Sequence, residues 1–188
     1  KKVLGSRKPL YCFITHSHYD HCGSVSIFKE KFSAMKVVSS EKARRIFGRP
    51  NAIALIKELN RVAEQLVQSI GLDYKPFAVF HPFETDLTAG KEDFFELSSG
   101  LTVRVMETPG HTWDCLSFYI PEKKILFSSE AAGQPDRTGY IISDCPADYG
   151  EYLHSLKRLS SLEVVLLCLV DLFVCTLRDV RLYLRESL

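Results

Sequence analysis

The chain has 188 residues, of which 46% are hydrophobic and 25% are charged, as is typical of one globular domain with a hydrophobic core. Its 24 lysines and arginines balance 23 aspartates and glutamates, leaving a formal charge of +1, so no net field favours nucleic acid or an anionic membrane as partner. We therefore expect a single domain over residues 1–188 that acts on a small molecule; the oligomeric state stays open.

The cysteine pattern indicates the cellular compartment in which the protein is expected to occur. The six cysteines show neither the density nor the C-x-x-C spacing of a disulfide framework or a zinc knuckle; they are Cys12, Cys22, Cys115, Cys145, Cys168 and Cys175. Residues 1–9 lack the apolar segment of a signal peptide, and no apolar run reaches the roughly 18 residues of a membrane helix. These features predict a cytoplasmic protein with no membrane span.

The first half of the chain alternates apolar runs with amphipathic segments, which predicts an α/β fold. The expected elements are a strand at 10–15, a helix at 24–32, a strand at 34–38, and helices at 41–47 and 51–70. Ser24 is the expected N-cap of the first helix, and Ser39 and Ser40 precede the second as cap residues.

The helix expected at 51–70 has the clearest pattern, because its apolar residues recur at spacings of three and four and Gly71 follows as a C-cap. We expect one face of this helix to pack against the body of the domain and the other to face solvent. The packed residues would be Leu59, Val62, Leu66 and Ile70, and the solvated ones Lys57, Asn60 and Gln68. We also expect the helical segment at 41–71 to form part of a substrate pocket.

Strands dominate the second half of the chain. The expected elements are strands at 77–80, 93–97 and 101–107, a hairpin of 117–120 and 125–127, a helix at 148–159, a strand at 163–169 and a closing helix at 172–184. No internal repeat or low-complexity linker divides the chain.

The densest chemical signal follows the first strand, in the sequence His16-Ser17-His18-Tyr19-Asp20-His21. Imidazole nitrogen and carboxylate oxygen are preferred ligands of zinc and related metals. Alternation along an extended turn lets His16 and His18 share one metal, while Asp20 and His21 face a second. An expression tag would be contiguous and terminal, unlike this segment.

This segment resembles the H-x-H-x-D-H signature of the metallo-β-lactamase superfamily. Two more elements similar to that family occur in the family's order: Thr108-Pro109-Gly110-His111-Thr112, and the strand end that carries Glu130. The resemblance implies an α/β fold of the αββα sandwich type. It implies His16, His18 and His111 as ligands of a first metal, and Asp20, His21 and Glu130 as ligands of a second. One or two ions of zinc, or of iron or manganese, would be the cofactor.

The sequence departs from the family's pattern at several places. Glu130 replaces the usual bridging Asp, and Asp171 stands where a late histidine completes the second metal site in the family. Asp171 is either an oxygen ligand or a helix N-cap, so we expect the second metal to bind more weakly than the first. Only fifteen residues precede His16, where the family has several strands, so we expect either an omitted segment of a longer protein or a fold that lacks its first strands.

The resemblance implies hydrolysis by a metal-bound hydroxide of a thioester, lactone or related ester, with Asp20 orienting the nucleophile or taking its proton. Cys115 stands where the family's thioesterases often have another histidine, which argues against a strict glyoxalase II. The alternatives are a binding or regulatory module with an incomplete metal site, and a phosphodiesterase or nuclease of the same superfamily. A di-iron electron-transfer enzyme is disfavoured, because such proteins resemble H-x-E-x-D and His18 holds the middle position.

Overall fold

The computed structural model describes residues 5–71, 80–170, 173–176 and 178–187. The chain divides into two compact units, Lys1–Thr88 and Ala89–Leu188, and each unit has its own cluster of buried side chains. Whether the two units fold as one domain, with the segment 41–71 beside a pocket, stays a prediction. Among the described residues, no helix is both long and apolar enough to cross a membrane.

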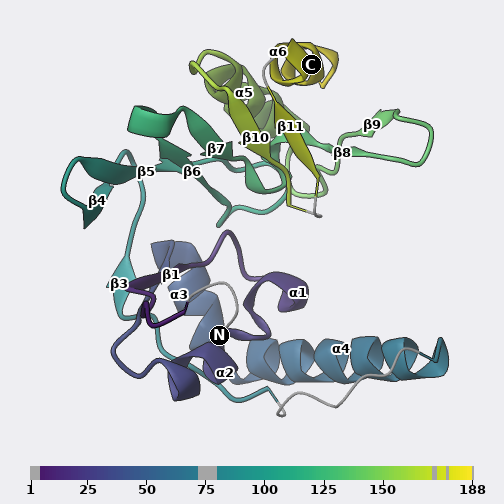
Figure 1. Ribbon diagram of the computed structural model, residues 1–188. Coiled ribbons are helices and arrows are strands. Elements are labelled where there is room, and N and C mark those ends of the chain that lie inside the picture. The colour runs from purple at the N-terminus through teal and green to yellow at the C-terminus, as the bar shows by residue number, and fades with distance from the viewer. Residues whose placement is uncertain (1–4, 72–79, 171–172, 177, 188) are drawn as a thin grey trace. The chain divides into compact units, whose positions relative to one another are not determined.

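The first unit is a three-stranded parallel sheet with helices (Figure 1). Its strands are β1 (Tyr11–Phe13), β2 (Lys36–Ser39) and β3 (Leu87–Thr88), and its helices are α1 (Tyr19–Cys22), α2 (Val25–Lys31), α3 (Glu41–Phe47) and α4 (Pro50–Ser69). Strand β1 pairs with β2, and β2 pairs with β3. Ile14 and Val37 are buried with Phe47 and Ile56 in one core, so the segment that leads into the histidine motif is anchored between the sheet and the helices.

The predicted helices of this unit are confirmed, with one difference at a cap. The Ser40 hydroxyl accepts a hydrogen bond from the backbone N–H of Ala43 and so caps α3. Ser24 occupies the N-cap position of α2, but its side chain makes no capping hydrogen bond.

The predicted orientation of α4 is wrong. Ile56 is the buried residue of this helix, whereas the four side chains that we expected to pack are exposed: Leu59 36%, Val62 47%, Leu66 64% and Ile70 64%. Asn60, which we expected in solvent, is half-buried; its amide lies so close to Gly23 that a Cβ there would come within 2.3 Å of its Oδ1. The helix has more apolar residues than one face can hold, and periodicity alone does not choose between overlapping faces.

The second unit is built on a six-stranded sheet with the order β11-β10-β7-β6-β5-β4. The strands are β4 (Phe94–Ser98), β5 (Leu101–Glu107), β6 (Leu116–Ile120), β7 (Ile125–Phe127), β10 (Leu166–Cys168) and β11 (Val174–Thr176). Strands β4 to β7 are antiparallel neighbours, and β10 runs parallel to β7. The carboxyl ends of β5, β7 and β10 therefore lie at one edge of the sheet.

Helices α5 (Tyr149–Ser160) and α6 (Arg178–Glu186) cover one face of this sheet (Figure 1). The face presents Met106, Tyr119, Leu126 and Leu167 to Tyr152 and its neighbours on α5 and α6. Full burial of one leucine contributes about 1.5–3 kcal/mol, so this cluster holds α5 firmly against the sheet. That matters for function because α5 also contacts the loop that carries His111.

The closing helix begins later than predicted. Residues 174–176 form β11, antiparallel to β10, because valine and threonine favour a strand when an edge is available; α6 then begins at Arg178. The sequence analysis also missed β3, the short hairpin of β8 (Gln134–Pro135) and β9 (Ile141–Ile142), and the 3-10 turns η1 (Pro121–Lys123) and η2 (Ser129–Ala132). The strand expected at 77–80 and the hypotheses on Asp171 fall on residues 77–79 and 171, outside the described part of the chain.

Candidate metal centre

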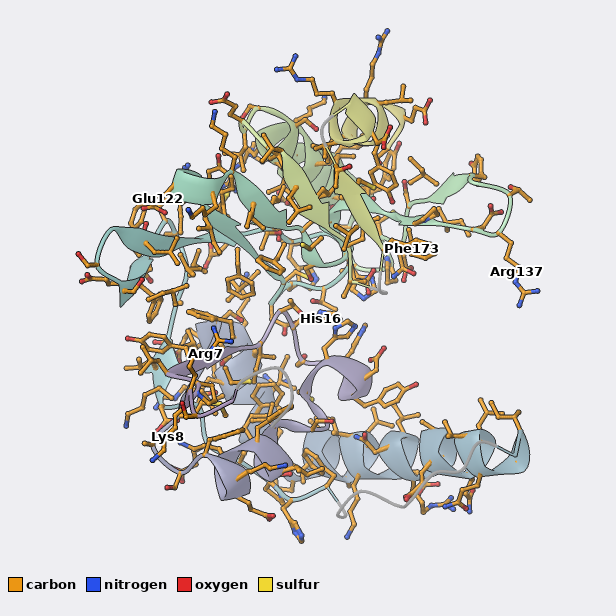
Figure 2. The ribbon with its side chains drawn as sticks, viewed as in Figure 1. Arg7, Lys8, His16, Glu122, Arg137 and Phe173 are labelled. Atoms are coloured by element: carbon orange, nitrogen blue, oxygen red, sulfur yellow. The ribbon has the colours of Figure 1, made fainter. Side chains whose placement is uncertain are left out.

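Three imidazoles of the first unit gather at the turn between β1 and α1. The ring centroids of His16 and His18 are 4.6 Å apart, and those of His16 and His21 are 4.1 Å apart. His16 lies at the start of this turn (Figure 2) and is fully buried, whereas His18 is exposed and His21 half-buried. The predicted cluster is thus compact, with His16 at its centre.

The turn is held by its backbone. The N–H groups of His21 and Cys22 both donate to the carbonyl oxygen of His18, at 3.1 and 3.2 Å, which starts α1 directly after the histidine and points His21 back toward His16. The buried Cys22 packs in the core of this unit, as free cysteines commonly do.

Thr15 orients two of these imidazoles, and the sequence analysis did not single it out. Its Oγ1 lies 3.1 Å from Nδ1 of His16 and 3.4 Å from Nδ1 of His21. With Nδ1 of both rings at this hydroxyl, a metal would meet both rings at Nε2. A hydroxyl next to a predicted ligand was the only available sequence signal, and threonine is too common for that to be specific.

Asp20, the predicted catalytic carboxylate, is 54% exposed and lies with Oδ2 3.5 Å from Nε2 of His21. It lies in the first turn of α1 beside the imidazole cluster and is exposed to solvent. Its carboxylate oxygens are ligands of the kind that zinc and related metals accept.

In the second unit, His111 and Glu130 follow the ends of β5 and β7 at the same edge of the sheet. Hydroxyl groups between these strand ends tie the two segments together: Thr108 Oγ1 lies 2.8 Å from Ser117 Oγ, and Ser117 Oγ donates to the carbonyl of Ser128 at 2.8 Å. These groups are buried, where hydrogen bonds are costly to leave unmade. The sheet thus fixes the backbone positions of the two predicted ligands relative to each other.

The loop that carries His111 is fastened to α5. Gly110 has a φ of +141° and its Cα faces the backbone of Tyr152, and its carbonyl accepts hydrogen bonds from the N–H groups of Ala147 and Asp148, both at 3.1 Å. Ser155 Oγ donates to the carbonyl of Pro109 at 2.8 Å. His111 is consequently buried, with 6% of its surface exposed, on a loop fixed from both sides.

Glu130 is also buried, with 4% exposure, in the 3-10 turn η2. Ser129 before it has a φ of +54°, a left-handed conformation that costs a non-glycine residue roughly 1–3 kcal/mol and is concentrated at functional sites. The amide of Gln134 donates to Glu130 Oε2 at 2.6 Å. The carboxylate is therefore held by a neutral donor, which keeps its negative charge uncompensated by that contact.

Cys115 does not supply a reactive thiolate. It is buried beside Ser129, with Sγ 3.6 Å from Oγ, and burial raises the pKa of its thiol. A protonated, enclosed thiol is a weak ligand and a weak nucleophile. Its position in the loop after His111 is thus a packing position.

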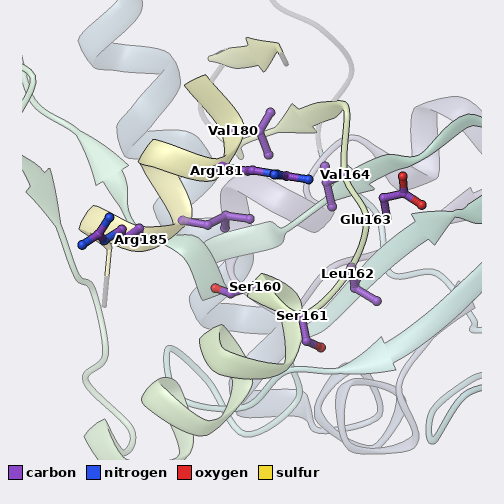
Figure 3. A pocket seen from close by; sticks show the side chains of 9 residues that line it. Ser160, Ser161, Leu162, Glu163, Val164, Val180, Arg181 and Arg185 are labelled. Atoms are coloured by element: carbon purple, nitrogen blue, oxygen red, sulfur yellow. The ribbon is translucent and has the colours of Figure 1, made fainter. Parts of the chain in front are cut away.

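A pocket of about 460 Å³ lies elsewhere in the second unit (Figure 3). It is lined by the end of α5, by the segment before β10 and by α6, and its charged residues are Glu163, Arg181 and Arg185. Its lining includes none of the predicted metal ligands, so it is distinct from the edge that carries His111 and Glu130.

Comparison with known proteins identifies the family. The family model of the metallo-beta-lactamase superfamily matches residues 1–169. The chain belongs to this superfamily. It is 27% identical over 156 residues to a metallo-beta-lactamase fold-containing protein from Sulfurisphaera tokodaii, covering 79% of this chain and 54% of that protein.

One further relative, and the solved structure of the archaeal protein just compared, show the range of the likeness. A hydroxyacylglutathione hydrolase from Bartonella tribocorum is 30% identical over 118 residues, 63% of this chain and 32% of that enzyme. A solved archaeal superfamily protein from Sulfolobus tokodaii matches with a TM-score of 0.70 at 22% identity, covering 98% of this chain and 68% of that structure. The mixed α/β fold is that of the metallo-β-lactamase superfamily, and the chain spans about half or less of the length of these curated relatives.

The donor set of this chain fits a metal. Four imidazoles and two carboxylates occupy the family's motif positions, and three of these side chains, those of His16, His111 and Glu130, are buried. Nitrogen and oxygen donors of this kind suit zinc, and also iron and manganese. The residues present are thus able to hold the metal that the family implies.

Proposed function

We propose that this chain is a metal-dependent hydrolase of a thioester, lactone or related ester. The observation that carries the proposal is the compact cluster of His16, His18 and His21 at the end of β1. Histidines that only face solvent are not expected to cluster around a buried imidazole, whereas the ligands of a metal are.

We assign His16, His18 and His111 to a first metal and Asp20, His21 and Glu130 to a second, as the family's motifs imply. When bound, such an ion would lower the pKa of a water ligand toward about 7 and would supply a nucleophile at neutral pH. Asp20, exposed beside His21, would orient that water and accept its proton. Glu130 has one more methylene than the family's usual Asp, so the second site should be the weaker one.

The substrate class rests on the relatives. Several are named hydroxyacylglutathione hydrolase, and these names support a thioester as our first candidate substrate. The buried Cys115 occupies the place of a histidine in related thioesterases, so a different acyl group or leaving group from theirs is expected. The near-neutral composition supports a small-molecule substrate, without nucleic acid or membrane. The scattered cysteines support a cytoplasmic location.

A second candidate is a binding or regulatory module that keeps the fold with an incomplete metal site. The hydrogen bond from Gln134 to Glu130 Oε2 favours it, because that contact occupies an oxygen which a bridging ligand would give to the metal. Metal stoichiometry separates the two candidates.

The test is elemental analysis of the purified protein together with hydrolysis of thioester, lactone and phosphodiester substrates. We expect one tightly bound ion, partial occupancy of a second site, and ester hydrolysis that His16→Ala and His111→Ala abolish together with the first ion. His154→Ala, which changes a histidine outside the motifs, is the matched control and should keep both. Absence of metal with an intact fold would support the module, and phosphodiester hydrolysis alone would support a nuclease.

A further inference from the structure

One contact of His111 belongs to no family motif. Nδ1 of its imidazole lies 3.1 Å from the carbonyl oxygen of Asp144 and 3.2 Å from Oδ2 of the same residue. Both atoms are oxygens of one residue, and they approach one ring nitrogen from the segment that precedes α5.

The chemistry of these two oxygens fixes the proton of the imidazole. A carbonyl oxygen and a carboxylate oxygen accept hydrogen bonds and do not donate them. Both contacts with His111 are favourable only if Nδ1 carries the hydrogen. In the neutral ring, Nε2 then holds the lone pair, and it is the nitrogen that can coordinate a metal.

The backbone holds Asp144 in this place. The carbonyl of Gly110, next to His111, accepts hydrogen bonds from the N–H groups of Ala147 and Asp148, and Asp148 caps α5 through a 2.9 Å bond to the N–H of Glu151. The segment that follows Asp144 is thus anchored both to the loop that carries His111 and to the start of α5.

We infer that Asp144 is a positioning residue for metal binding: its oxygens hold the hydrogen of His111 on Nδ1 and so leave Nε2 as the nitrogen that can coordinate the metal. This rests on the proposed function, since it assigns a role toward the metal. A ligating histidine whose second nitrogen donates to a carboxylate or carbonyl is a recurrent arrangement, and removal of such a partner commonly costs 10–100-fold in metal affinity. The carboxylate of Asp144 is 56% exposed, so solvent screens its charge and the lower end of that range applies.

The first test measures Zn²⁺ affinity of the full chain by competition with a chromophoric chelator. Asp144→Ala should bind about tenfold more weakly than the wild type, and Asp144→Asn, which keeps an acceptor oxygen without the charge, should lie between the two. Asp179→Asn removes the same charge from an exposed position on α6 and should bind like the wild type. If Asp144→Ala binds Zn²⁺ as tightly as the wild type while His111→Ala does not bind it, the inference about Asp144 is wrong. The proposed function would still stand.

The second test needs no metal. Long-range ¹H–¹⁵N spectra of the metal-free protein, at a pH above the usual histidine pKa of about 6.5, report the tautomer of each imidazole, and His111→Ala assigns the signals. The wild type should show hydrogen on Nδ1 of His111, and Asp144→Ala should show a smaller population of that tautomer. Hydrogen on Nε2 in the wild type would overturn the inference, whereas a wild type that binds no Zn²⁺ would refute the proposed function and the inference with it.

Discussion

Gly110→Ala is the substitution that most directly probes how the His111 loop is held. The backbone of Gly110 has a φ of +141°, and a Cβ at this position would lie 2.4 Å from Cα and 2.5 Å from Cβ of Tyr152. Tyr152 is fully buried on α5, so the clash is with a backbone that cannot move without displacing the helix.

The expected cost has two parts. An alanine in this backbone conformation is strained by about 1–3 kcal/mol, and forcing extra volume into a packed interface costs about 1–3 kcal/mol more. We expect a loss of about 2–6 kcal/mol, a large share of the roughly 5–15 kcal/mol that stabilises a typical protein. Gly139→Ala is the matched control, because its φ is +88° and no atom lies within 4 Å of the added Cβ; it should lose only the strain.

Guanidinium unfolding measures both variants. Trp113 is the only tryptophan of the chain and lies on the same loop, so its fluorescence reports local unfolding while far-UV circular dichroism reports the helices. If Gly110→Ala is destabilised no more than Gly139→Ala, the close approach of this loop to α5 does not hold and the account of how His111 is positioned is wrong.

Three further outcomes follow from burial and charge. In α4, the exposed Leu66→Lys should change the free energy of unfolding by less than about 0.5 kcal/mol, whereas the buried Ile56→Ala should cost about 2–5 kcal/mol, as chemical denaturation would show. Burial acts to raise the pKa of Asp86, but hydrogen bonds from Lys29 and Val37 outweigh it and hold that pKa below the ordinary 3.8. Since a lowered pKa in the folded state stabilises above the unfolded pKa, Asp86→Asn should lose about 1–2 kcal/mol at neutral pH. That difference should disappear in acid titrations as pH falls through the folded pKa. Burial raises the pKa of Cys115, so mass spectrometry should find its alkylation by iodoacetamide slow in the folded protein and fast after unfolding.

The sequence was most informative where one physical signal dominated. The strand at 101–107 was predicted with its observed bounds, since alternation, a preceding glycine and a following proline all agree. The motif His16 to His21 could be placed after a strand because the apolar run before it ends abruptly. At these positions the local sequence pattern and the tertiary environment favour the same structure, and secondary structure can then be predicted from sequence.

The remaining features depend on contacts that a single sequence does not display. Residues 174–176 became a strand because β10 offers an edge, and α4 is rotated because Asn60 meets Gly23. Asp144 lies 33 residues from His111, so no spacing rule could have connected them. Tertiary partners override local preference at these positions.

The histidines of the two units are oriented by the same principle with different hydrogen-bond partners. In the first unit Nδ1 of His16 and His21 faces Thr15 Oγ1, and in the second Nδ1 of His111 faces two oxygens of Asp144. A threonine oxygen has two lone pairs and one proton, so it can accept from both imidazoles only when its own proton points elsewhere. If both rings bind metal through Nε2, both must donate from Nδ1, and Thr15 must accept twice. The metal-free protein has no such requirement, because one ring can then accept the hydroxyl proton and keep its own hydrogen on Nε2. Binding of the metal would therefore require that ring to exchange its hydrogen on Nε2 for one on Nδ1, with no net loss of a proton, and Thr15 would turn from donor to acceptor.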